Sequence, residues 1–284
     1  MIKGIYEFIS EAQLKKYAEL AVRAGVNLQE NQLLIIHSDI QNATFARLIQ
    51  TAAYEAGASN VFIDWTDEQS TKEFFLNAAD SVIDHYPDWQ AARFKEWDDA
   101  DAAYIHIISE NLEVFKEVSS ERINRYQKAS RTKLRDYHEK IRSHEVRWCL
   151  LAVPNVEWAT KVFPNLSKEE ALQSLWELML KGSRADGENP MKDWESHNRA
   201  FESRKKFLNE NQFESLHFTN SCGTDLLVGL PENHRYIGGG VIDKEGIPFF
   251  PNIPTEEIFT APHKNKVNGK LVSASSWCQS YLHP

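Results

Sequence analysis

The residues best suited to chemistry lie near the end of the chain, where Glu256 and Glu257 follow a proline-rich turn and precede His263. Neighbouring carboxylates repel each other, so a fold tolerates them best when one faces solvent and the other faces a cation. Successive side chains of an extended segment point to opposite faces, so only one of the pair can enter a given pocket. The spacing makes one glutamate a candidate metal ligand, with a solvated acidic turn as the alternative. His263 is a weaker candidate for contact with a metal or a substrate.

Other catalytic motifs are incomplete or absent. His144 and Glu145 begin an H-E-x-x-H motif, but Trp148 stands where the second histidine of a zinc site belongs. The sequence holds no G-x-S-x-G nucleophile elbow. Cys222 lies in a turn with no base placed beside it by the sequence, which favours a plain turn cysteine over a nucleophile.

Nucleotide binding is disfavoured as well. A dinucleotide site needs a glycine-rich turn after the first strand, and the segment 37–41 that follows the apolar run 33–36 contains no glycine. The glycine cluster 238–240 follows a β-rich region and is interpreted as a flexible turn.

Composition excludes several classes of protein. The chain has 284 residues, 42% of them hydrophobic and 26% charged, as in an ordinary globular protein. A net charge of -9 argues against binding to nucleic acid or to anionic membranes. No apolar run approaches the roughly 20 residues that span a bilayer, and the N-terminal residues lack a signal-peptide pattern. The 3 cysteines are widely spaced, which fits a reducing cytoplasm.

The hydrophobic periodicity predicts an α/β fold with an open, mainly parallel sheet flanked by helices. Short apolar runs predict strands at 33–36, 61–63, 102–108 and 146–153. Amphipathic patterns and capping residues predict helices at 10–25, 45–56, 71–79, 89–97, 121–140 and 167–182, and from Asn189 onward. The aromatic residues of this last helix, Trp194, Phe201 and Phe207, are expected to pack in a core.

The period changes to two from Leu216, where alternating residues on both sides of a turn at 220–223 predict a hairpin. This hairpin is expected to close an N-terminal α/β domain of residues 1–245. A change of composition at 246–248 then marks a β-rich segment, 246–284, that begins a second domain.

Several stretches together resemble one family, the two-metal aminopeptidases of the aminopeptidase S and T group (thermophilic, leucyl-type). The matching stretches are residues 16–28, 53–58, 158–164, 200–209, 223–226, 228–231 and, most specifically, 251–263. They occur in the family's order from about Leu14 to about Ser273, which covers nearly the whole chain.

The resemblance implies an N-terminal α/β domain followed by a catalytic domain that binds two divalent metals, described as zinc or cobalt. It implies a metal-dependent aminopeptidase that removes N-terminal residues from peptides with a metal-activated water. It also implies a homodimer. In the family's motif the second glutamate is a metal ligand, so the resemblance assigns that role to Glu257, with Glu256 as its outward neighbour, and assigns no other catalytic residue.

The sequence departs from the family after this motif. Family members continue with a domain-sized stretch that carries a second, bridging glutamate, histidines and an aspartate. Residues 275–284 do not resemble the family. We therefore expect an incomplete metal site, and no aminopeptidase activity from residues 1–284 alone. His283 is interpreted as part of a frayed end. The alternative is a non-catalytic α/β module that dimerises or binds a partner, with apolar surface exposed around Phe249, Phe250, Ile258 and Phe259.

Overall fold

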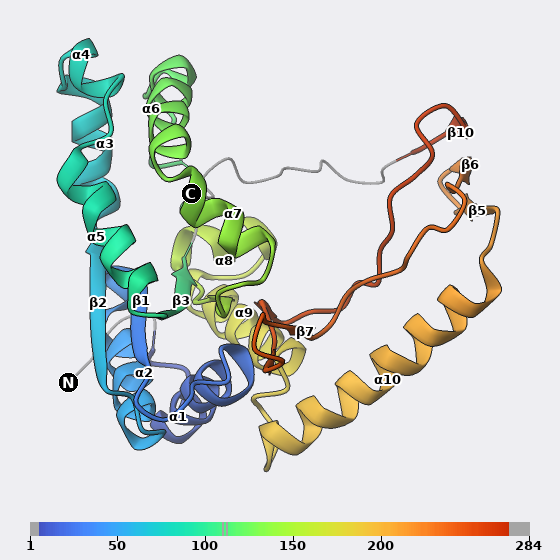
Figure 1. The fold of residues 1–284 in the computed structure, drawn as a ribbon, viewed down its shortest axis with the longest axis horizontal. Helices are drawn as coiled ribbons and strands as arrows, with labels where there is room; N and C mark the ends of the chain where they lie inside the picture. The colour runs from blue at the N-terminus through green and yellow to red at the C-terminus, as the bar shows by residue number, and fades with distance from the viewer. Residues whose placement is uncertain (1–5, 110, 112, 273–284) are drawn as a thin grey trace. The chain divides into compact units, whose positions relative to one another are not determined.

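The computed structural model describes residues 6–109, 111 and 113–272 (Figure 1). Contacts group the chain into two compact units, Met1–Trp194 with Gly240–Pro254, and Glu195–Gly239 with Thr255–Pro284. This grouping describes packing, and the domain boundary between residues 245 and 246 stays a prediction.

The first unit is built on a five-stranded parallel sheet, which confirms the predicted fold class. Its strands, in sheet order, are β2 (Asn60–Thr66), β1 (Leu33–Asp39), β3 (Ala103–Ile108), β4 (Trp148–Ala152) and β9 (Asn252–Ile253). The short β9 comes from the proline-rich segment and pairs with Leu150 and Leu151 of β4. A separate antiparallel pair joins β7 (Val241–Ile242) to β8 (Pro248–Phe249).

Helices connect these strands and cover the sheet (Figure 1). They are α1 (Glu11–Leu20) with the π-helix η1 (Ala21–Gly25), the 3-10 turn η2 (Ile40–Asn42), α2 (Ala43–Glu55), α3 (Glu68–Asn77), α4 (Asp80–Ile83), α5 (Asp88–Asp99), α6 (Ser120–Lys133), α7 (Arg135–Arg142), α8 (Val156–Val162) and α9 (Lys168–Gly182). The capping boxes predicted at Ser10 and Ser167 are both present, and each serine accepts the backbone N–H three residues on.

Alternate residues of each strand enter different cores because successive side chains point to opposite faces. Leu34 and Ile36 of β1 pack in the main core with α1, α2, α8 and α9. Ile35, between them, packs on the other face with Trp97 of α5 and Tyr104 of β3. The fully apolar runs therefore belong to strands covered on both faces, as predicted.

One detail of the predicted helices is wrong. The helix expected over 121–140 is two helices, because the chain leaves helical geometry at Leu134, a buried apolar residue within a polar stretch. Gly25 is the last residue of η1, so the helical stretch ends where it was predicted to end. Its lack of a side chain leaves room for Cys149, whose Sγ would lie 2.7 Å from a Cβ at this position.

The second unit comprises most of the long helix α10 (Pro190–Asn211) and a three-stranded antiparallel sheet in the order β10-β6-β5. The predicted hairpin is confirmed as β5 (Ser215–Thr219) paired with β6 (Asp225–Gly229), and β10 (Val267–Lys270) adds to its other side. Asn189 caps α10 through a hydrogen bond from the Lys192 backbone, as predicted.

The expected burial of aromatic residues is correct in part. Trp194 and Phe201 are 1% exposed, but Phe207 is 58% exposed, so the expectation of core packing is wrong for this residue. Phe249 is fully buried and Phe250 packs against Trp194 with a ring separation of 5.3 Å, which contradicts the expectation that both are uncovered. Phe259, at 52% exposure, is uncovered as expected.

Within the part of the chain that the structure describes, no helix is both long enough and apolar enough to cross a membrane.

Candidate functional site

The segment that carries the glutamate pair is held by its backbone at three points within the second unit. The carbonyl oxygen of Thr255 lies 2.8 Å from Nε2 of His197. Phe259 exchanges two backbone hydrogen bonds with Ile237, each 2.9 Å long. Further on, the His263 N–H donates to the carbonyl of Gly229 at 2.7 Å. Because these bonds use the main chain, they leave the side chains between them available for other contacts.

His197 of α10 is the contact that the sequence analysis missed. Its side chain is 8% exposed and its ring packs edge-on against Phe201 with a centroid separation of 4.7 Å. Its Nε2 also lies 3.7 Å from Oε1 of Glu256. A signal was present in the sequence, since His197 shares the helical spacing of Trp194 and Phe201, one turn away on either side.

The two glutamates differ in their surroundings. Glu256 faces His197 and its side chain is 54% exposed. Glu257 is exposed, and its Oε2 accepts a hydrogen bond of 3.3 Å from the Glu256 backbone N–H. Both carboxylates are therefore at the surface, and only that of Glu256 lies near the His197 imidazole.

Gly238 allows the segment around residue 238 to lie close to the backbone of Glu257. A Cβ at Gly238, whose φ is 140°, would collide with the Glu257 carbonyl oxygen. At Gly239, with φ 74°, a Cβ would lie 3.0 Å from the Phe201 ring. Both glycines have the positive φ that a glycine turn uses, and they also allow close contacts with the motif segment and with α10 that the sequence did not indicate.

Asn209 of α10 fixes the start of this glycine segment. Its side-chain amide donates to the carbonyl of Tyr236 at 3.1 Å, and its Oδ1 accepts the Tyr236 N–H at 2.8 Å. One side chain thus satisfies both backbone groups of a residue outside regular secondary structure. A path of contacts leads from α10 through Tyr236 and Gly238 to Glu257.

This arrangement provides one ligand of the right chemical kind for a divalent metal. An exposed carboxylate on a fixed backbone is the hard oxygen donor that such ions prefer. Residues 6–109, 111 and 113–272 contain no group of three or more histidine, cysteine, aspartate or glutamate side chains placed to hold a metal ion. Glu257 therefore fits as a single ligand, and a complete site needs further donors.

The residues of the β5–β6 hairpin make contacts that support its own fold. Thr224 is buried, and its Oγ1 donates to the carbonyl of Val272 and accepts the Val272 N–H. Asp225 lies 2.6 Å from Nε2 of His217 across the hairpin. Cys222 is exposed in the turn, where its N–H donates to Asn220. His283 lies outside the described residues.

The first unit holds a charged network that the sequence did not indicate. Arg93 makes two hydrogen bonds to Asp64, and Nδ1 of His37 lies 3.2 Å from the same carboxylate. Burial alone would raise the pKa of Asp64, but His37 and Arg93 outweigh it and hold that pKa below its usual value. The three residues come from β1, β2 and α5, so only the folded sheet brings them together.

A comparison with protein families identifies the family of this chain. Residues 10–279 match the model of a family described as thermophilic metalloproteases (M29). The match includes the segment 251–263.

Curated relatives are similar over most of this chain. Aminopeptidase AmpS of Bacillus subtilis is 37% identical over 261 residues, which is 92% of this chain and 63% of the relative. Aminopeptidase T of Thermus thermophilus is 36% identical over 266 residues, which is 92% of this chain and 64% of the relative. The solved structure of wild-type AmpT from Thermus thermophilus aligns with a TM-score of 0.82 and 34% identity, covering 90% of this chain and 63% of that one. The chain thus spans less than two thirds of the length of these relatives.

Proposed function

This chain belongs to the thermophilic metalloprotease family, and from that membership we propose that it acts in a metal-dependent aminopeptidase that removes N-terminal residues from peptides. The observation that carries the proposal is the family match over residues 10–279, which includes the glutamate motif. The alternative of a non-catalytic module is not favoured, because its relatives are named aminopeptidases.

In this proposal Glu257 binds one of two divalent metals, zinc or cobalt. When bound, such metals supply an activated water and polarise the scissile carbonyl. The role of this chain is to position the carboxylate. Gly238 and the Ile237–Phe259 hydrogen bonds support the backbone on which Glu257 lies.

Domain organisation, assembly and location complete the proposal. Residues 1–245 form the N-terminal domain and residues 246–284 begin the catalytic one.

The protein is a homodimer, a proposal supported by exposed apolar side chains in the second unit such as Phe207, Phe218 and Leu271. A cytoplasmic location is supported by free cysteines at positions 149 and 222. Light scattering of the purified chain tests the dimer.

Paramagnetic cobalt tests the metal ligand without relying on activity. We expect Co²⁺ added to residues 1–284 to broaden the amide resonances around Glu257 selectively. Glu257→Gln should abolish this effect, whereas Glu256→Gln, with the same charge loss at the adjacent position, should retain it. Broadening that survives Glu257→Gln would contradict the assigned role.

Activity provides a second test. Because the described residues place no third ligand near Glu257, we expect residues 1–284 to hydrolyse no aminoacyl p-nitroanilide in the presence of zinc or cobalt. Metal-dependent turnover that is unchanged in Glu257→Gln would show that the reaction uses a different site.

A further inference from the structure

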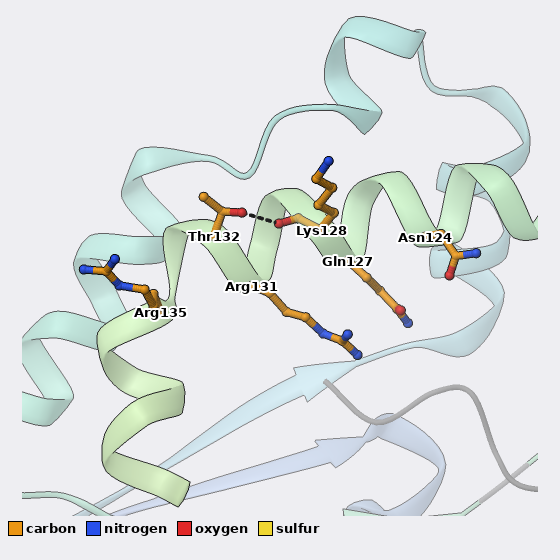
Figure 2. A pocket seen from close by; sticks show the side chains of 6 residues that line it. All are labelled: Asn124, Gln127, Lys128, Arg131, Thr132 and Arg135. Carbon is orange, nitrogen blue, oxygen red and sulfur yellow. Dashed lines mark hydrogen bonds between the residues drawn. The ribbon is translucent and has the colours of Figure 1, made fainter. Parts of the chain in front are cut away.

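The pocket beside α6 does not gather its polar side chains around one point. The residues that line it are Asn124, Gln127, Lys128, Arg131, Thr132 and Arg135, and all but Gln127 are exposed. Figure 2 shows Lys128 and Thr132 extending to one side of the helix, and Gln127 and Arg131 to the other. His197 of α10 differs, because its side chain is buried and contacts the segment that carries Glu257.

The hydrogen bond of His197 fixes the position of a proton. Its Nε2 lies 2.8 Å from the carbonyl oxygen of Thr255. Because a carbonyl oxygen only accepts hydrogen bonds, Nε2 carries the hydrogen and is the donor. Both partners are shielded from water, since the His197 side chain is 8% exposed and Thr255 is 6% exposed. A hydrogen bond in such surroundings is electrostatically stronger than one in water, so it holds Thr255 firmly to α10.

The His197 ring is itself held by its neighbours. Phe201 lies one helical turn further along α10, and the two rings meet edge-on with their centroids 4.7 Å apart. Phe201 is 1% exposed, and the backbone at Gly239 approaches it so closely that a Cβ there would lie 3.0 Å from its ring. The imidazole is therefore presented to Thr255 by a packed helix and not by a flexible loop.

Thr255 and Phe259 fix the two ends of the short segment around Glu257. Thr255 accepts the hydrogen bond from His197, and Phe259 exchanges two backbone hydrogen bonds with Ile237. Glu257 lies midway between these two residues in the chain. Fixing both ends of a segment removes much of the conformational freedom of the residue between them. The backbone of Glu257 thus depends on His197 at one end and on Ile237 at the other.

His197 also distinguishes the two glutamates. Oε1 of Glu256 lies 3.7 Å from the same Nε2 that donates to Thr255. This distance is longer than a hydrogen bond, and the attraction across it is weak at an exposed position, but it favours the side of the segment that faces α10. The Glu257 carboxylate instead accepts the Glu256 backbone N–H through its Oε2. The carboxylate that stays available to a metal is therefore that of Glu257.

We propose that His197 is a positioning residue for the metal ligand. It holds the carbonyl of Thr255, and through it the backbone that carries Glu257, and it keeps the Glu256 carboxylate on the side of α10. In this role His197 touches neither the metal nor the substrate. The proposal rests on the proposed function, because it takes Glu257 to be the ligand.

The test is a Co²⁺ titration of residues 1–284, followed by the broadening of amide resonances around Glu257. His197→Phe keeps a ring against Phe201 but lacks the N–H, and we expect it to lower the apparent Co²⁺ affinity about fivefold. His197→Gln places an amide N–H within reach of the same carbonyl, and we expect it to bind Co²⁺ like the wild type. The control is His217→Phe, which makes the same change at a histidine of the hairpin that is 57% exposed. It should leave the Co²⁺ affinity unchanged.

Hydrogen exchange of the Phe259 amide provides a readout without metal. We expect His197→Phe to speed this exchange and His197→Gln to restore it, while the amides of the β5–β6 hairpin exchange as in the wild type. If His197→Phe also speeds exchange of the hairpin amides, it has disrupted the second unit, and His197→Asn takes its place. Asparagine carries the same amide as glutamine on a shorter side chain, so it should show the loss that glutamine restores.

The outcomes separate the positioning role from the ligand. Equal Co²⁺ affinities of the wild type and His197→Phe, or equal losses in His197→Phe and His197→Gln, overturn the positioning role and leave Glu257 as the ligand. Absence of broadening around Glu257 in the wild type contradicts the ligand itself, and with it the proposed function on which the positioning role rests.

Discussion

The backbone of Gly238 lies directly against the carbonyl oxygen of Glu257, closer than any residue with a Cβ would allow. Gly238 also has φ 140°, a conformation that other residues rarely adopt. The position of the proposed metal ligand thus depends on a glycine about twenty residues earlier in the chain.

Gly238→Ala is expected to displace the segment that carries Glu257. The substitution adds a collision with the neighbouring backbone to a conformational cost of about 1–3 kcal/mol. We expect faster hydrogen exchange of the Phe259 amide, which donates to Ile237. The control is Gly246→Ala, which has a positive φ of 86° but no atom within 4 Å of the added Cβ. If Gly238→Ala and Gly246→Ala change the exchange of the Phe259 amide equally, the close contact between Gly238 and Glu257 does not hold this segment in place.

Asn209→Ala is expected to release the glycine segment from α10. It removes both hydrogen bonds to Tyr236 and leaves two backbone groups unpaired, at a cost of about 1–3 kcal/mol. The measurement is hydrogen exchange of the Tyr236 and Ile237 amides. Asn211→Ala is the matched control, because that side chain donates to the Phe207 carbonyl within its own helix. If the Tyr236 amide exchanges at the same rate in Asn209→Ala as in the wild type, the Asn209 side chain does not hold Tyr236 in place.

Gly25→Ala is expected to destabilise the first unit by about 1–3 kcal/mol through overpacking. Its Cβ would lie 2.7 Å from Cys149 Sγ and 3.3 Å from Ile253 Cδ1. Cys149→Ala should reduce this penalty, because it removes the sulfur from the collision. The free energies of unfolding of both single variants and the double variant measure the coupling. Simple additivity would show that Gly25 and Cys149 do not compete for the same space.

Glu68 is expected to make stability fall between pH 4.5 and about 7. Burial, followed by the negative charge of Asp39, raises the pKa of Glu68 from 4.5 to about 7. The folded protein therefore keeps a proton that the unfolded chain releases, so rising pH favours unfolding across this window.

The measurement is urea denaturation across this pH range. Glu68→Gln should be more stable than the wild type above pH 7 and should lack that part of the pH dependence. Glu121→Gln, at an exposed position of α6, is the control. A wild-type and a Glu68→Gln protein with parallel pH profiles would refute the raised pKa.

Local patterns predicted most of the regular structure. Ser10 and Ser167 cap their helices as expected because a capping box depends only on residues three positions apart. The alternation on both sides of residues 220–223 likewise predicted the β5–β6 hairpin. Phe207 was misjudged because helical spacing shows that residues share a face, and what covers that face depends on the rest of the chain.

Short-range periodicity and residues adjacent in the chain were enough to predict the parallel α/β architecture, the helix caps and the motif containing Glu257. The contacts that support this motif could not be predicted in this way. His197 meets Thr255 across 58 positions, and Gly238 meets Glu257 across a loop. Neither pairing has a local signature, because each depends on where two separate segments lie once the chain has folded.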